Sequence, residues 1–252
     1  MNNETKRHRN ELLEGKIIYF LVMTVLVQFL YPISVSDSPL VLILYQIFYM
    51  SFFAAGIYLV SSNRRVMWLL AAATVGWLIV GPIYAFRPDL LWANFIGYLL
   101  IIFFQLALTM ILIRFIFRAR VVNRDVLLAA ITVYLLLGAI FVPVYGIIET
   151  LTWFPEQTTH AFVDGLNNYE NVPFPWQNFV YYSYATLTTL GYGDILPSTF
   201  WARSIATFEA VVGVLYTAVI VARLIGLYAA RDVEKDIANQ TTARSAAEPA
   251  QK

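Results

Sequence analysis

The chain has 252 residues, of which 60% are hydrophobic and only 13% are charged, and its mean hydropathy is +0.66. A soluble domain of this length would not carry so much apolar surface, so the composition predicts an integral membrane protein. The formal net charge is +1 and there is no cysteine, which excludes disulfides and thiolate metal sites.

Six apolar segments are long enough to cross the ~30 Å hydrocarbon core of a bilayer, which takes about 20 helical residues. In chain order they are 17–35, 40–60, 66–86, 90–117, 126–151 and 201–228. The first four are predicted to form a peripheral domain, 17–119, after a short N-terminus, 1–16. The last two belong to a second unit, 126–230, and a polar tail, 231–252, follows. The predicted fold class is an all-α membrane protein with six transmembrane helices.

Lysine and arginine indicate the orientation, because cytoplasmic loops are enriched in them. Of the 17 lysines and arginines, all but Arg87 and Arg203 fall in the N-terminus, around the loops after spans two and four, or near the C-terminal end. Both termini are therefore predicted to be cytoplasmic, and the loop before the sixth span is predicted to face outward.

The segment Thr188 to Asp194, which reads Thr-Thr-Leu-Gly-Tyr-Gly-Asp, lies between the fifth and sixth spans. Backbone carbonyls can replace the water shell of a cation only if successive residues turn their C=O groups to one side. That arrangement needs positive φ at some positions, which Gly191 and Gly193 tolerate at little cost. The preceding segment, 175–188, is too short to span and fits a re-entrant helix whose negative C-terminal end points at the cation. Residues 195–197 are predicted to form a proline turn.

These residues resemble the pore-loop potassium channel superfamily. Thr189 to Gly193 reads TLGYG, one conservative change from the potassium filter TVGYG. The resemblance covers about 126–230 and implies the following parts: outer helix 126–151, turret 152–174, pore helix 175–188, filter 189–193 and inner helix 201–228. It also implies a homotetramer, because one loop supplies a quarter of a ring. Potassium ions would occupy the filter, and no organic cofactor is expected.

The resemblance assigns roles around the filter. The K⁺-binding positions would be Thr189, Leu190, Gly191, Tyr192 and Gly193. Tyr192 is expected to brace the strand by hydrogen bonding into the pore helix. The residues that would support the filter are Tyr181, Tyr182, Thr188, Asp194 and Glu209.

The inner helix is predicted to hold the gate. Trp201 matches the tryptophan that opens this helix, and Gly213 matches a glycine proposed as a gating hinge. Spacings of three and four from Gly213 place Thr217, Val221 and Ile225 on one face, which would line the cavity and close it by dewetting at the apolar rings. The alternative is that Gly213 only allows close packing against the pore helix.

Two polar residues are ambiguous from sequence. Glu209 lies in an apolar run one turn before Gly213, where an ionisable group is a functional candidate. It could hydrogen-bond the pore helix, reaching Tyr184 or Thr186, or it could be a packing residue. His160 is interpreted as a solvated turret histidine, with a proton sensor as the alternative.

Acidic residues predominate in the outward segments, where no lysine or arginine occurs between Arg124 and Arg203. Fourfold repetition would make a negative mouth that concentrates cations. The alternative is that acidic residues outside are simply unconstrained. The residues concerned are Glu149, Glu156, Asp164, Glu170 and Asp194.

Span four departs from the voltage-gated members of the superfamily. A voltage sensor needs arginines inside the membrane field and acidic partners on neighbouring helices. Residues 90–110 carry no positive charge, and Arg114, Arg118 and Arg120 come only at the cytoplasmic end. We therefore expect the peripheral domain to anchor the pore. The compact layout and the missing sensor indicate a bacterial plasma membrane protein.

The predicted function is a potassium-selective channel that conducts passively and is gated at the inner helix or the filter. The alternatives are a weakly selective cation channel and a nonconducting partner subunit. An intramembrane hydrolase is poorly supported because no span holds a histidine or cysteine, so the protein is not expected to be an enzyme. The expected partners are three further copies and membrane lipids, with no nucleic acid.

Overall fold

The computed structural model describes residues 15–35, 38–86, 90–156, 159–167, 169 and 174–247. Within these residues the chain is almost entirely helical, as predicted, with one 3-10 helix and one small sheet. Residues 1–14, which make up most of the predicted N-terminus, lie outside the described part, as do Arg87, Glu170 and 248–252.

The peripheral half consists of α2, α3, α4 and α5 with one 3-10 helix, η1. Their bounds are α2 Lys16–Phe29, η1 Tyr31–Val35, α3 Pro39–Leu59, α4 Arg64–Phe86 and α5 Leu91–Arg118. The first α-helix is shorter than the predicted span 17–35. Pro32 has no amide hydrogen and disfavours the α conformation at Tyr31, so the chain tightens into η1 after Phe29.

The second half consists of α6, α7 and α8 with two short strands. Their bounds are α6 Arg124–Glu156, β1 Phe162–Asp164, α7 Trp176–Leu187, β2 Ile195–Pro197 and α8 Phe200–Ala247. The antiparallel pairing of β1 with β2 corrects the predicted turret loop and the predicted turn at 195–197. The helix α8 also continues well beyond the predicted end of the inner helix at residue 228, through most of the predicted tail.

Among the described residues, four helices are long and apolar enough to cross a membrane by length and composition. These stretches are Arg64–Gly81, Leu91–Arg118, Arg124–Trp153 and Phe200–Ala229. Two shorter apolar helical stretches, Lys16–Phe29 and Ile43–Leu59, accompany them. The chain is thus a multi-pass helical membrane protein, and six spans remain a prediction.

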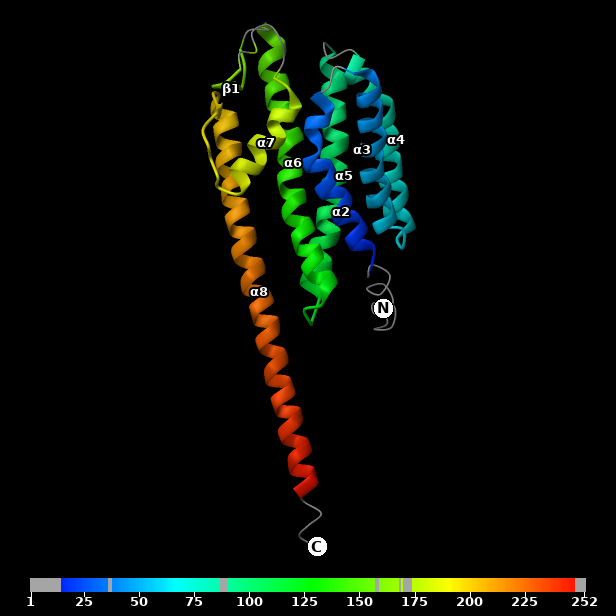
Figure 1. Ribbon diagram of the computed structural model, residues 1–252, viewed down its shortest axis with the longest axis vertical. Coiled ribbons are helices and arrows are strands. Elements are labelled where there is room, and N and C mark those ends of the chain that lie inside the picture. The colour runs from blue at the N-terminus through cyan, green and yellow to red at the C-terminus, as the bar shows by residue number, and fades with distance from the viewer. Residues whose placement is uncertain are drawn as a thin grey trace.

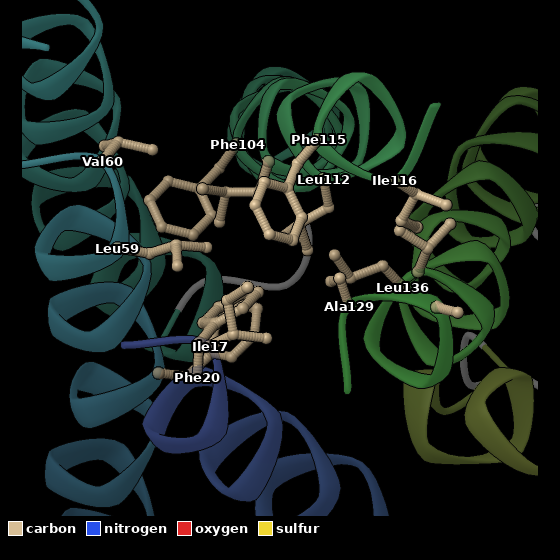
Figure 2. Close-up of a cluster of buried hydrophobic side chains, with 14 of the residues drawn as sticks. Ile17, Phe20, Leu59, Val60, Phe104, Leu112, Phe115, Ile116, Ala129 and Leu136 are labelled. Carbon is tan, nitrogen blue, oxygen red and sulfur yellow. The ribbon is translucent and has the colours of Figure 1, made fainter. Parts of the chain in front are cut away.

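Helix α6 lies between the two halves. In Figure 1 the helices α2 to α5 stand on one side of α6, whereas α7 and α8 lie on the other. Figure 2 shows the buried cluster that joins α6 to the peripheral helices, whose members include Phe20, Leu59, Phe104, Leu112 and Leu136. One continuous apolar core therefore joins the peripheral half to the second half.

A second buried cluster is aromatic and surrounds the outer part of α7. The ring centroids of Tyr145 and Tyr182 lie 5.1 Å apart, and those of Phe162 and Phe179 also lie 5.1 Å apart. Phe162 from β1 and Ile195 from β2 are both buried here. This burial explains why the two short strands pair, since each places one apolar side chain into the same cluster.

Candidate functional site

The segment Thr188 to Asp194 leaves the C-terminal end of α7 with an alternating backbone. The φ angles of Thr189, Gly191 and Gly193 are +58°, +54° and +81°, and the two residues between them are not in the positive-φ region. Alternation of this kind turns successive C=O groups to the same side of the strand. The two glycines meet the conformational need predicted for them. Thr189 does so at a cost of about 1–3 kcal/mol, because it is β-branched.

The amide groups of this segment point back at α7. The N–H groups of Leu190 and Gly191 both donate to the carbonyl oxygen of Ala185, at 2.8 and 3.2 Å. The hydroxyl of Thr188 donates to the carbonyl oxygen of Tyr184 at 2.6 Å and so caps the helix. In the described part of the chain, no carbonyl oxygen from Thr188 to Gly193 accepts a hydrogen bond. The strand therefore presents free oxygens on the side away from α7.

This strand lies on an open face of the chain. The side chain of Leu190 is 53% exposed and that of Tyr192 is 70% exposed. The predicted brace from Tyr192 is not made within one chain, since its phenol has no hydrogen-bond partner among the described residues. Trp201, at the start of α8, is exposed as well.

Asp194 closes the segment and is held from two directions. The phenol of Tyr181 donates to its Oδ2 at 2.7 Å, and the N–H of Gly165 donates to its carbonyl oxygen at 2.7 Å. Of the aromatic pair expected around the filter, only Tyr181 therefore reaches it. Tyr182 points the other way, into the outer aromatic cluster, where its ring lies 5.2 Å from that of Phe162.

Glu209 is fully buried and joins three helices behind the predicted filter. Its Oε1 lies 2.5 Å from the hydroxyl of Ser183 on α7, and its Oε2 accepts from the phenol of Tyr145 on α6. The hydroxyl of Ser183 also lies 2.8 Å from the carbonyl oxygen of Gly138. A contact with the pore helix was predicted, but the predicted partners were wrong. Tyr184 instead donates to the carbonyl oxygen of Leu135, because it lies one residue further around α7.

The predicted gating residues line one hollow below the filter. The hollow has a volume of about 740 Å³, and its lining includes Gly213, Thr217, Val221 and Ile225 together with Thr189. These positions share one face of α8, as their spacing predicted.

Gly213 faces the end of α7. A β-carbon at this position would collide with the carbonyl oxygen of Leu187 and would lie 3.0 Å from its Cδ1. A contact with backbone oxygen cannot be relieved by a side-chain rotation. The geometry therefore supports the close-packing role of Gly213, which was the alternative to a hinge.

Of the outer acidic residues that the structure describes, one does not lie on an open surface. Glu149 is 3% exposed and paired with His160, so its expected contribution to an open mouth is wrong. Partial burial acts to raise the pKa of Asp164, but hydrogen bonds from Asn167 and from the amides of Leu166 and Asn167 hold that pKa below its ordinary value. The side chain of Glu156 lies outside the described part.

His160 is not the solvated loop residue that was expected. Its Nδ1 lies 2.5 Å from Oε1 of Glu149, and its Nε2 lies 3.1 Å from the carbonyl oxygen of Tyr169. Its ring stacks on Trp153 with a centroid distance of 4.4 Å and an interplanar angle of 23°. The side chain is 17% exposed, so Glu149, Tyr169 and Trp153 cover most of the ring.

The arginines of α5 and α8 differ in their surroundings. Arg114, Arg118 and Arg120 are exposed and form no ion pair in the part of the chain that the structure describes. Arg223 on α8, by contrast, donates to the carbonyl oxygens of Ile116, Phe117 and Ala119 at the end of α5. Its guanidinium also lies 4.9 Å from the centroid of the Phe117 ring.

Several of these contacts were missed from the sequence. Arg223 was counted only as a cytoplasmic charge, and Glu149 only as part of an acidic mouth. Tyr145 and Ser183 were not singled out at all. Burial would have been the signal for Glu149, because it falls within the apolar run that forms α6.

Residues 129–229 match the protein family described as "Ion channel". The match begins in the second turn of α6 and ends in α8, so it includes the strand at 188–194 and the hollow below it. It supports a pore-loop ion channel and points to a transport protein rather than an enzyme. Comparison with curated proteins and with solved structures finds no match for the chain.

Proposed function

We propose that the chain is one subunit of a homotetrameric potassium channel, which conducts K⁺ passively through a ring of backbone carbonyls. One observation carries the proposal. Positive φ at Thr189, Gly191 and Gly193 alternates along a strand whose carbonyl oxygens accept no hydrogen bond from the described residues. Such oxygens can replace the hydration shell of a potassium ion.

The exposed face of the strand supports the tetramer. A single strand supplies only one wall of a filter, and the strand lies open on the side where the other walls would stand. The neighbouring face of α8 is apolar and exposed, with Phe208 at 59%, Val214 at 55% and Leu215 at 57%. Closed rotational symmetry would bury these surfaces and bring four strands together. Tyr192 would then find its hydrogen-bonding partner on a neighbouring subunit.

Two places are proposed for the gate. Val221 and Ile225 are 49% and 63% exposed on the face that lines the hollow, so four copies would make apolar rings that stop ions by dewetting. The filter itself is the second place, and Glu209 would hold it through Ser183. In this proposal both termini are cytoplasmic, all six apolar helical segments cross a bacterial plasma membrane, and lipids cover the peripheral helices.

A weakly selective cation channel and a nonconducting partner subunit are the competing functions. The filter keeps its tyrosine, Tyr192, and the alternating backbone is intact at every expected position. Both features support potassium selectivity over either alternative.

The proposal is tested with purified protein in liposomes. We expect potassium and rubidium to pass far better than sodium, and barium to block the flux. A reversal potential that ignores the potassium gradient in a potassium/sodium bi-ionic recording would overturn the proposal. The Tyr192→Asp substitution should admit sodium, whereas Tyr228→Phe, a tyrosine substitution on α8 far from the filter, should leave selectivity unchanged.

A further inference from the structure

The ring of His160 is placed between two oxygen acceptors. Nδ1 faces the carboxylate of Glu149 at 2.5 Å, and Nε2 faces the backbone carbonyl oxygen of Tyr169 at 3.1 Å. A neutral imidazole has one N–H and one lone pair, so it can satisfy only one of two such acceptors. Both contacts can be hydrogen bonds only when the ring and the carboxyl group together hold two protons. One proton then lies between Nδ1 and Glu149, and the other lies on Nε2.

The surroundings favour this protonation state of the pair. Trp153 stacks on the ring at 4.4 Å, an arrangement that attracts a cationic ring. Glu149 is buried, and among the described residues its one further hydrogen bond comes from the N–H of Ala161 to its Oε2 at 2.8 Å. A buried carboxylate of this kind needs a positive or donating partner.

The other titratable groups near the ring already have partners. The phenol of Tyr169 accepts from the side chain of Asn178 at 3.0 Å. Asp164 on β1 is engaged by the amides of its own loop. Among the described residues, Glu149 is therefore the acidic group that faces His160.

The backbone at His160 is joined to the strand that leaves the filter. The hydroxyl of Ser198 donates to the carbonyl oxygen of His160 at 2.6 Å, and the N–H of Ser198 donates to that of Ala161 at 2.9 Å. Phe162 then pairs with Pro197 and Asp164 with Ile195 in the sheet. A short path of backbone contacts thus leads from the ring to Asp194 at the end of the filter.

We propose that His160 and Glu149 form a proton-binding site that fastens the turret to the exit strand of the filter. When the ring loses its second proton as pH rises, either Glu149 or the carbonyl of Tyr169 loses its donor, and the fastening loosens. Proton binding at this site is independent of the proposed function, whereas its effect on conduction rests on that function.

The first test measures protons on the ring. The chain has two histidines, so the His8→Gln variant leaves one ring for nitrogen NMR in lipid nanodiscs. From about pH 5 to about pH 9, a window that brackets ordinary histidine titration, we expect the doubly protonated ring at the lower end. In the Glu149→Gln variant the side-chain amide can donate to Nδ1, so this nitrogen should carry no proton and Nε2 should keep its own. Nitrogen signals of the variant that match those of the wild type at every pH would overturn the proposal.

The second test measures the fastening. Hydrogen exchange at the amides of Ala161 and Gly165, corrected for intrinsic pH dependence, should accelerate about tenfold once the ring deprotonates, since a donor to a buried charge is lost. The His160→Gln variant should show no such step. A flat profile in the wild type would contradict the fastening role.

Rubidium flux across the same pH range then tests the coupling. We expect flux to change with pH in the wild type and to be flat in His160→Gln. If ring and amides respond while flux does not, the site does not regulate conduction and that part of the proposal is wrong. If no variant conducts at any pH but the ring titrates as expected, the proposed function fails and the proton site stands.

Discussion

The helices behind the proposed filter and the helices of the peripheral half are held by different kinds of contact. Behind the filter, hydroxyl groups of Tyr181, Ser183 and Tyr184 reach specific oxygens on α6, α8 and the filter's end. In the peripheral half, rings meet rings, as where the centroids of Phe53 and Phe104 lie 4.6 Å apart.

This difference shows where the molecule needs positional accuracy. A hydrogen bond fixes distance and direction, whereas packed rings tolerate small shifts. The two halves also differ in how they treat buried polar atoms. Glu209 and Ser183 are fully buried and paired, but Tyr45 Oη and Gln105 Oε1 in the peripheral half are buried with no hydrogen-bond partner among the described residues.

A substitution at Glu209 should have the largest effect on the hydrogen-bonded contacts that distinguish this half from the peripheral half. Removing it with Glu209→Ala would leave the buried phenol of Tyr145 without its partner, leave Ser183 only its contact with Gly138, and create a cavity. We expect a loss of about 3–5 kcal/mol in stability and a loss of potassium selectivity. Thermal unfolding in detergent and rubidium/sodium flux in liposomes would measure the two effects.

Glu209→Gln is the matched control. Two hydroxyl protons serve three oxygen–oxygen contacts among Tyr145, Ser183, Glu209 and the carbonyl of Gly138, so the carboxyl group must supply the third proton. A glutamine can donate to Ser183 and accept from Tyr145 in the same positions. It should cost less than about 1 kcal/mol. A glutamine variant as damaged as the alanine variant would show that the network needs an ionised carboxylate.

Gly213 gives the next largest effect. The Gly213→Ala substitution forces a β-carbon against the backbone oxygen of Leu187, and overpacking of this kind costs about 1–3 kcal/mol. Because Leu187 precedes the filter, we expect lower rubidium flux and weaker selectivity. Gly226→Ala is the control, since nothing lies within 4 Å of the added carbon there. Equal behaviour of the two variants would favour a hinge rather than close packing.

Arg223 tests the junction of the two halves. It donates to three backbone carbonyls at the end of α5, so Arg223→Gln should destabilise the protein by about 1–2 kcal/mol, a value discounted for partial exposure. Arg223→Lys keeps the charge but loses the planar guanidinium. Its stability should therefore lie between that of the wild type and that of Arg223→Gln. Thermal unfolding compares them, with the exposed Arg118→Gln as a reference. No difference between Arg223→Gln and that reference would mean the junction does not need this contact.

The smallest effect is expected in α5. Moving one charge through 100 mV involves only ~2.3 kcal/mol, so steep voltage gating needs several charges inside the membrane field. Neutralising Arg114 and Arg118 together should leave the conductance–voltage relation unshifted. A steep relation that flattens in the double variant would make the peripheral half a sensor.

Local sequence predicted the parts of the site that depend on local chemistry. The glycines at 191 and 193 require positive φ, and both have it. The short helix before the filter was predicted at 175–188 and is found at Trp176–Leu187. Apolar length likewise predicted a helix for each of the six segments, although it did not predict that Pro32 would shorten the first.

Contacts between distant segments could not be predicted in the same way. Glu149 and His160 meet because α6 runs on to Glu156 before the chain turns back, and no periodic pattern marks that turn. The pairing of β1 with β2 depends on two apolar residues, Phe162 and Ile195, that share one cluster. Single polar residues such as Ser183 carry no signal until their neighbours in space are known.

The length of α8 has a mechanical consequence. The helix runs for 48 residues, or roughly 72 Å at 1.5 Å per residue, and extends far beyond the other helices in Figure 1. Its apolar stretch ends at Ala229, and no glycine or proline interrupts it from Leu227 to Ala247. Because helices bend sharply mainly at proline, at Gly/Ser pairs and at π-bulges, the stretch beyond Ala229 behaves as one straight rod. A tilt of about 10° there would sweep the far end sideways by roughly 5 Å.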